Sequence, residues 1–204
     1  GEALTYQNEV TYPFGYGLSY TTFEQKLENV EVNLNERTVT ADVTVKNTGN
    51  TAGKDAVQLY VSVPYTDYDR EHLVEKSAIQ LLDYGKTEEL KPGESTTVTI
   101  TADAQDMTSW DSTSKNEAGT EGNYILDAGD YFFTVGDDAH HAMNNVLAAQ
   151  SRSEANGMTE AGDASNVKTW NLASIDTTTF AYTKNGTAVE NQLQDMDLNH
   201  YMEN

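Results

Sequence analysis

The stretch TVTADVTVK, residues 38–46, decides the fold class of this chain. Its apolar side chains alternate with threonine and aspartate and share one face: Val39, Ala41, Val43 and Val45. A period of two is typical of a β-strand that buries one face and exposes the other to water. The stretch therefore predicts a strand with one side in an apolar core.

Similar alternation recurs on both sides of this stretch. It predicts further strands at residues 30–34, 57–63, 79–84, 98–100, 124–126 and 131–135. Within residues 79–84 the apolar face switches, which favours a β-bulge. We expect Ala128-Gly129 to join the last two strands as a hairpin. Seven short strands separated by turns predict an all-β chain, a seven-stranded sandwich of the immunoglobulin or fibronectin type III-like kind.

One short helix is predicted after the last strand. Asp137 or Asp138 can cap it by accepting hydrogen bonds from backbone N–H groups. Apolar residues then recur at three- and four-residue spacing: Ala139, Ala142, Met143, Val146 and Leu147. This narrow apolar stripe predicts a helix that docks on a protein surface.

The remainder of the chain is predicted as an irregular extension. Residues 151–166 are polar and small, which indicates a linker or a long loop. Beyond them, two weak strands are predicted around Trp170 and Leu172 and around Phe180 and Tyr182, and Asn185-Gly186 predicts a tight hairpin turn. The tail has too few apolar residues for a core of its own, so we expect it to lie on the sandwich or on a neighbouring domain.

Composition excludes several classes of partner and chemistry. The 204 residues include 33 acidic and 12 basic side chains, for a net charge of −21. Such a surface repels nucleic acid and anionic membranes, so neither is an expected partner. The chain has no cysteine, which excludes disulfides, thiol catalysis and cysteine-based zinc sites. No run approaches the roughly 18 apolar residues of a membrane helix. The compartment stays open, whether extracellular, cell-surface or cytoplasmic.

The segment YPFGYGLSY, residues 12–20, precedes the strands and gathers aromatic side chains. Pro13 restricts its own φ, and the glycines permit positive φ or a close backbone approach. Four large side chains alternate around them and can anchor the segment against two surfaces: Phe14, Tyr16, Leu18 and Tyr20. We expect these four to pack against another domain; the alternative is a loop packed on its own domain.

This segment resembles the junction that leads from the α/β sandwich domain into the fibronectin type III-like domain in glycoside hydrolase family 3. Further stretches resemble the same family in the same order: VKNTG at 45–49, AGKDAVQLYV at 52–61, LKPGES at 90–95, LDAGDY at 126–131 and VG at 135–136. Together these matches cover residues 10–150. GDDAHHAMNNVLAA, residues 136–149, further resembles a bacterial subgroup in which both domains precede the catalytic barrel.

The resemblance implies a division of the chain. Residues 1–22 would end the α/β sandwich domain, residues 23–150 would form the fibronectin type III-like sandwich with its helix, and residues 151–204 would lead to the next domain. The implied parent is a retaining, exo-acting β-glycosidase of the β-glucosidase kind that needs no cofactor. Its partners would be the other domains of the polypeptide and the parent's β-glucoside or oligosaccharide substrate.

No catalytic, cofactor-binding or metal-ligating residue is predicted in this chain. The family's nucleophilic aspartate lies in the barrel and its acid/base glutamate usually lies in the α/β sandwich domain, so neither is carried over. His140 and His141 point about 100° apart on a helix and cannot easily share one ion. Asp195–Asn199 starts like a calcium loop, but His200 replaces the glycine required at the sixth position.

Two functions remain open. The first is a non-catalytic accessory domain that buttresses the catalytic domains of such a glycosidase. The second is a stand-alone carbohydrate-binding or adhesive module, which would use exposed aromatic rings as platforms for sugars. Trp110 and Trp170 are candidate platforms, and Tyr65 and Tyr68 lie in a loop that could reach an adjacent active site. The alternative for this loop is packing at the rim of another domain.

Overall fold

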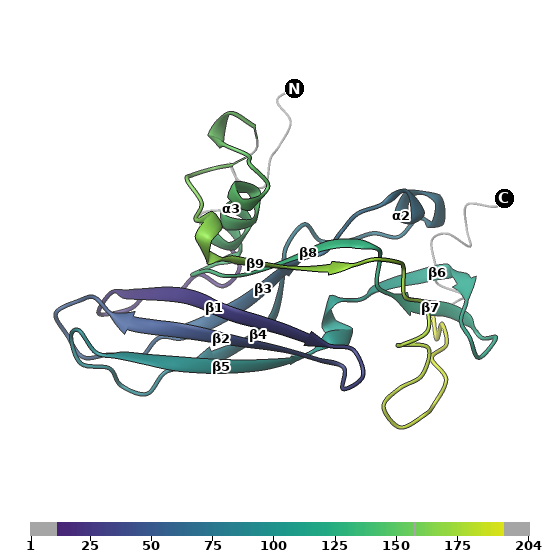
Figure 1. Cartoon of the computed structure of the whole chain (residues 1–204), viewed down its shortest axis with the longest axis horizontal. Coiled ribbons are helices and arrows are strands. Elements are labelled where there is room, and N and C mark those ends of the chain that lie inside the picture. The colour runs from purple at the N-terminus through teal and green to yellow at the C-terminus, as the bar shows by residue number, and fades with distance from the viewer. Residues whose placement is uncertain (1–11, 157, 194–204) are drawn as a thin grey trace.

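The computed structural model describes residues 12–156 and 158–193, and β-strands dominate them (Figure 1). The strands are β1 Phe23–Asn33, β2 Thr38–Asn47, β3 Ala56–Ser62, β4 Gln80–Lys86, β5 Ser95–Asp103, β6 Ser109–Lys115, β7 Glu121–Ile125, β8 Gly129–Val135 and β9 Val167–Leu172. The α-helices are α2 Asp67–His72 and α3 Ala139–Ala149. Short 3₁₀ turns are η1 Ala104–Met107, η2 Glu154–Asn156 and η3 Ala164–Asn166. Neither α-helix of this described part is long and apolar enough to cross a bilayer.

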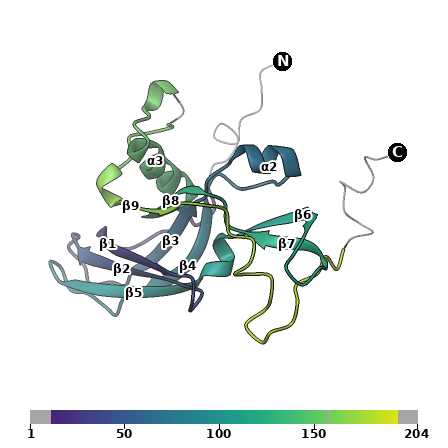
Figure 2. The same cartoon turned by 45° about the vertical axis from the view of Figure 1, so that its right-hand side comes forward.

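Two antiparallel sheets form the predicted all-β sandwich. One sheet has three strands in the order β1-β2-β5, and the other has four in the order β4-β3-β8-β9. A separate two-stranded ribbon, β6-β7, extends from one end of the sandwich together with α2 (Figure 2). The two sheets hold seven strands, as predicted, although the set differs because β9 enters and β7 leaves.

The predicted hairpin through Ala128-Gly129 is wrong. Strand β7 pairs with β6, whereas β8 pairs with β3 and β9. Strand β6 was not predicted because its buried positions carry polar side chains, Ser109 and Asp111. A strand without an apolar alternation gives no period-two signal, and β7 was consequently assigned to the wrong neighbour.

The alternation in residues 38–46 builds the core as predicted. Its apolar side chains are fully buried and lie opposite those of the second sheet, which include Val57, Leu59, Val61 and Phe133. Burial of each such side chain stabilises the fold by about 1.5–3 kcal/mol. The expected β-bulge is also present, since the β3-β4 register shifts between Leu59 and Tyr60.

Asn166 closes the edge where the two sheets meet. Strands β1 and β9 are edge strands of opposite sheets, and Asn166 stands just before β9. Its Oδ1 accepts a hydrogen bond from the Leu27 N–H at 2.7 Å, and its Nδ2 donates to the Gln25 carbonyl at 3.2 Å. The side-chain amide therefore pairs two backbone groups of β1 that no neighbouring strand reaches.

The same residue belongs to a larger cluster, here called the buried amide network: Thr134, Asn145, Asp163 and Asn166. The Thr134 hydroxyl donates to the Asn166 carbonyl at 2.8 Å. Asn145 Nδ2 donates to Thr134 Oγ1 at 3.3 Å, and Asn145 Oδ1 accepts from the Asp163 N–H at 2.7 Å. The network ties helix α3 and the segment before β9 to strand β8.

Helix α3 begins where the sequence predicted. The Asp138 carboxylate accepts a hydrogen bond from the His141 N–H at 2.9 Å and so caps the helix. Ala142 and Val146 of this helix are buried, and the helix lies against strands β8, β3 and β9 of the four-stranded sheet (Figure 1). Further along the chain, the turn at Asn185-Gly186 is also confirmed, with Gly186 at φ +79°.

We predict that Asn166→Ala destabilises the chain by at least about 2 kcal/mol, because the buried Leu27 N–H and the partly buried Gln25 carbonyl of β1 lose their partner. Urea denaturation followed by circular dichroism measures the change. Asn171→Ala is the matched control: this asparagine in β9 is exposed, and its side chain donates to Asp130 Oδ1 at the surface at 2.7 Å. Its substitution should cost less than about 0.5 kcal/mol. Equal effects of the two substitutions would contradict the role of Asn166.

Candidate domain-docking site

The aromatic segment has a fixed backbone. Gln58 Nε2 donates a hydrogen bond to the Gly15 carbonyl at 2.8 Å. The Ala139 N–H, at the start of α3, donates to the Phe14 carbonyl at 2.9 Å. Gly15 has φ +89°, and a Cβ there would overlap Gln58 and the Tyr60 hydroxyl. Glycine is therefore required at this close approach.

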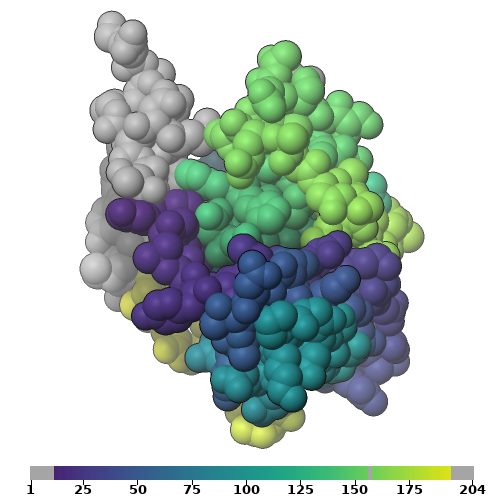
Figure 3. Space-filling view, turned by 90° about the vertical axis from the view of Figure 1, so that its left-hand side faces the viewer, coloured from purple at the N-terminus to yellow at the C-terminus, as the bar shows by residue number. Residues whose placement is uncertain are grey.

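The large side chains of the segment nevertheless point into solvent. Phe14 is 60% exposed, Leu18 is 90% exposed, and Tyr20 is fully exposed. Figure 3 shows the segment in purple against the green surface of α3 and the chain that follows it. A monomeric surface rarely offers a contiguous patch of this kind without a partner. Their predicted role in packing against another domain stays a prediction.

An apolar hollow, here called the α3 groove, adjoins the segment. It has a volume of about 920 Å³ and lies between α3 and the chain that enters β4. Its apolar lining comes from Phe14, Tyr60, Ile79, Leu81, Met143 and Leu147. The predicted stripe on α3 therefore serves two surfaces: Ala142 and Val146 face the sheet, whereas Met143 and Leu147 face the groove.

The described lining of the groove is mostly apolar. No aspartate or glutamate is among its described lining residues, whereas glycoside hydrolysis needs two carboxylates across the bond. Burial raises the pKa of Tyr60 to about 12, so its hydroxyl stays protonated and donates to Gln58 Oε1 at 2.7 Å. Across the described ranges 12–156 and 158–193, no three His, Asp or Glu side chains gather as a metal site requires.

Tyr65 and Tyr68 have different environments. The Tyr68 hydroxyl donates to the buried Asp111 carboxylate at 2.7 Å, and its ring stacks on His72 with centroids 3.9 Å apart. Burial acts to raise the pKa of Asp111. Hydrogen bonds from Tyr68 and Thr113 have the larger effect, so the pKa of this carboxyl lies below its usual value. Tyr68 thus attaches α2 to β6. Tyr65 is the exposed ring of this pair, and contact of either with a sugar stays a prediction.

Helix α2 itself was not predicted, because residues 65–71 were interpreted as a loop. The signal was present in the sequence: a threonine at position 66 and an acid at 69 form a helix-capping pattern. Asp69 Oδ2 accepts a hydrogen bond from the Thr66 N–H at 2.7 Å. Leu73 ends the helix with φ +55°.

A buried ion cluster anchors the same loop. The Lys76 side chain is only 5% exposed, and its Nζ lies 2.8 Å from Asp69 Oδ1. It also contacts Asp127 Oδ2 and donates to the Pro64 carbonyl at 3.0 Å. Burial raises the pKa of Asp127, and the nearby Lys76 ammonium opposes that rise. The cluster fixes the loop that carries α2 onto the start of β8. No local pattern reveals it, because Asp127 is 51 positions from Lys76.

We predict that Lys76→Met destabilises the chain by about 3–5 kcal/mol at pH 7, because buried carboxylates lose their cation. Without Lys76 the pKa of Asp127 rises further. In the folded variant Asp127 then binds a proton at higher pH than it does in the unfolded chain. The loss of unfolding free energy caused by the substitution therefore shrinks as the pH falls through the folded-state pKa of Asp127. Urea unfolding at pH 5 and pH 7 measures both effects.

Lys184→Met provides the matched control. Lys184 also pairs with an aspartate, with Nζ 2.7 Å from Asp103 Oδ2, but its side chain is 56% exposed. The loss for such a pair should be under about 1 kcal/mol. A loss from Lys76→Met that is as small, or that does not depend on pH, would contradict the proposed cluster.

Comparison with known proteins defines the class. Residues 55–139 match the family model described as "Fibronectin type III-like domain". The chain is 37% identical over 143 residues to Beta-glucosidase A of Butyrivibrio fibrisolvens, which covers 64% of this chain and 16% of that protein. It is 35% identical over 139 residues to the Beta-glucosidase of Ruminococcus albus, covering 67% of this chain and 13% of that protein.

Solved structures agree with this match. A β-glucosidase structure from Paenibacillus barengoltzii superposes with a TM-score of 0.57 at 27% identity. The alignment covers 84% of this chain and 16% of that one. The sandwich is therefore a fibronectin type III-like domain. More particularly, it matches the fibronectin type III-like region of family 3 β-glucosidases, as the sequence motifs predicted.

Proposed function

We propose that this chain is a non-catalytic accessory domain of a family 3 β-glycosidase of the β-glucosidase kind. Its α3 groove and aromatic segment would hold the α/β sandwich and barrel domains of the same polypeptide in a fixed relative position. Residues 1–22 would end the preceding domain, and residues 151–204 would run towards the following one. The order would be that of the permuted bacterial subgroup, with the barrel after this domain.

One observation carries the proposal: the aromatic segment has a fixed backbone and exposed rings. Hydrogen bonds from Gln58 and Ala139 hold its main chain in place, yet Leu18 and Tyr20 point into solvent. A loop that packs on its own domain would bury these side chains. The α3 groove continues this surface, since Phe14 belongs to both. The chain covers only 16% of the Butyrivibrio relative, so there is ample further polypeptide to occupy this surface in such a protein.

Accurate placement of domains matters for this class of enzyme. The two catalytic carboxylates of a retaining glycosidase stand about 5–5.5 Å apart. In the proposed enzyme they come from two different domains, so any shift between the domains changes that separation. A misplacement of about 1 Å can reduce a rate about 100-fold. A rigid domain bound to both would hold the separation constant.

The neighbouring gene sequence gives the first test. We expect the reading frame to encode an α/β sandwich domain before this chain and a barrel after it. A frame without a barrel would sink the proposal and leave a stand-alone module as the better hypothesis. The chain alone should release no nitrophenol from nitrophenyl β-glucoside, and any release that depends on the chain would contradict a non-catalytic role.

A substitution in the α3 groove tests the docking surface. In the polypeptide that this frame encodes, Leu147→Glu should lower β-glucosidase activity by up to about 100-fold, because a charge in the groove displaces the neighbouring domain. In the 204-residue chain, the same substitution should change the melting temperature by no more than a few degrees relative to the unsubstituted chain. Tyr84→Glu is the control, since it also puts a charge in place of an apolar surface residue, here on β4, but Tyr84 lies outside the described groove lining. Full activity of the Leu147→Glu enzyme would contradict docking at this surface.

A further inference from the structure

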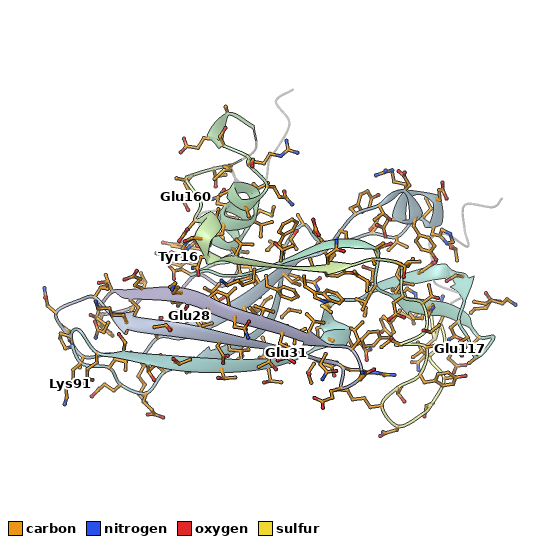
Figure 4. The ribbon with its side chains drawn as sticks, in the orientation of Figure 1. Tyr16, Glu28, Glu31, Lys91, Glu117 and Glu160 are labelled. Carbon is orange, nitrogen blue, oxygen red and sulfur yellow. The ribbon has the colours of Figure 1, made fainter. Side chains whose placement is uncertain are left out.

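A second hollow lies on the β6-β7 ribbon, away from the α3 groove. It has a volume of about 680 Å³ and is bounded by the ribbon and by residues 183–193. This volume falls within the roughly 300–1,000 Å³ that is usual for small-ligand sites. Figure 4 places Glu117 at the tip of the ribbon and Tyr16 beside the start of α3, well apart along the long axis of the molecule.

The floor of the hollow is aromatic and rigid. Trp110 and Tyr124 are cross-strand partners, with ring centroids 4.9 Å apart in an edge-to-face arrangement. Gly122 has φ +82°, and a Cβ there would overlap the six-membered ring of Trp110. The indole therefore lies directly over the glycine backbone. The glycine backbone fixes one face of the indole. The Trp110 side chain as a whole is half-buried, and it also lines the hollow.

The rim of the hollow is polar and lacks cations. It carries amide, hydroxyl and carboxylate groups from Gln105, Thr183, Thr187, Glu190 and Gln192. No lysine or arginine is among the described lining residues. The Glu190 carboxylate would repel an anionic ligand, whereas amides and hydroxyls pair well with neutral hydroxyl groups.

The segment that forms one wall is held in place. The Asn191 N–H donates to the Glu121 carbonyl at 2.8 Å, and the Val189 N–H donates to the Ala181 carbonyl at 2.9 Å. The Val189 carbonyl accepts from the side chains of Asn116 and Thr120. The hollow is consequently preformed, and a ligand would meet little cost of ordering the protein.

We propose that this hollow is a binding site for a neutral saccharide, with one pyranose ring stacked on Trp110 and its hydroxyls bonded to the polar rim. A pyranose presents an apolar face of C–H groups and an equatorial edge of hydroxyls. An aromatic ring with a negative π-face matches the first, and amides with a carboxylate match the second. The site is separate from the docking surface, so this inference stands or falls independently of the proposed function.

Intrinsic fluorescence tests the site directly. The chain has two tryptophans, and Trp170 packs against Tyr131 with ring centroids 5.1 Å apart. In Trp170→Phe, Trp110 becomes the only tryptophan of the chain. Titration of this variant with cellotetraose should give a saturable emission change with a dissociation constant on the order of millimolar. Glucose 6-phosphate, an anionic sugar, should bind at least about tenfold more weakly because the rim repels it.

Isothermal calorimetry on substituted chains tests whether Trp110 binds the saccharide or only packs on Gly122. Trp110→Leu should abolish the heat of cellotetraose binding. If that variant fails to fold, Gln192→Ala with Glu190→Gln serves instead, since both side chains are exposed. The double variant should weaken binding about tenfold or more. Tyr65→Ala, which alters an exposed ring outside the hollow, should leave binding unchanged.

Three outcomes would overturn the site. The first is no emission change and no heat up to saturating concentrations of cellotetraose. The second is binding that persists unchanged in the rim variant. The third is binding that is lost in Tyr65→Ala but retained in Trp110→Leu, which would place the saccharide on the α2 loop instead.

Discussion

The buried amide network between α3 and the sandwich is the constraint on which the rest of the structure depends. Asn166 pairs two backbone groups of β1, and Asn145 pairs helix α3 with β8 and with the segment before β9. A buried polar group that loses its partner carries the full cost of its desolvation. The network therefore admits one arrangement, in which α3 lies across the four-stranded sheet. Gly162 allows the close contact this needs, since a Cβ there would overlap the Asn144 backbone.

The docking surface follows from that arrangement. Once α3 is fixed, its Met143 and Leu147 side chains form one wall of the groove, and its first N–H group holds the Phe14 carbonyl. The aromatic segment is thus ordered before any partner binds. Ordering that has already taken place in the free chain does not reduce the affinity of docking. A surface of this kind suits a domain whose role is to hold its neighbours at a fixed separation.

The opposite end of the molecule is organised by charge and by aromatic contacts. Lys76 joins the loop bearing α2 to Asp127, where the chain leaves the ribbon and enters β8. Tyr68 and Asp111 join α2 to β6. The ribbon is therefore braced against the sandwich, and the hollow whose floor is Trp110 and Tyr124 keeps its shape. One accessory domain would in this way combine the proposed docking face with the proposed saccharide site.

The sequence by itself determined the features that depend on neighbouring residues. Alternation in residues 38–46 determined the buried face of β2, the Asp137-Asp138 pair determined where α3 starts, and Asn185-Gly186 determined a turn. Only the tertiary structure decided which strands pair and which buried polar groups meet. The exchange of β7 for β9, the contacts of Asn166 and the cluster around Lys76 all join residues far apart in the chain. Local periodicity reports which side of a strand faces the core, but it carries no information about the partner across it, because that choice depends on the packing of the whole chain.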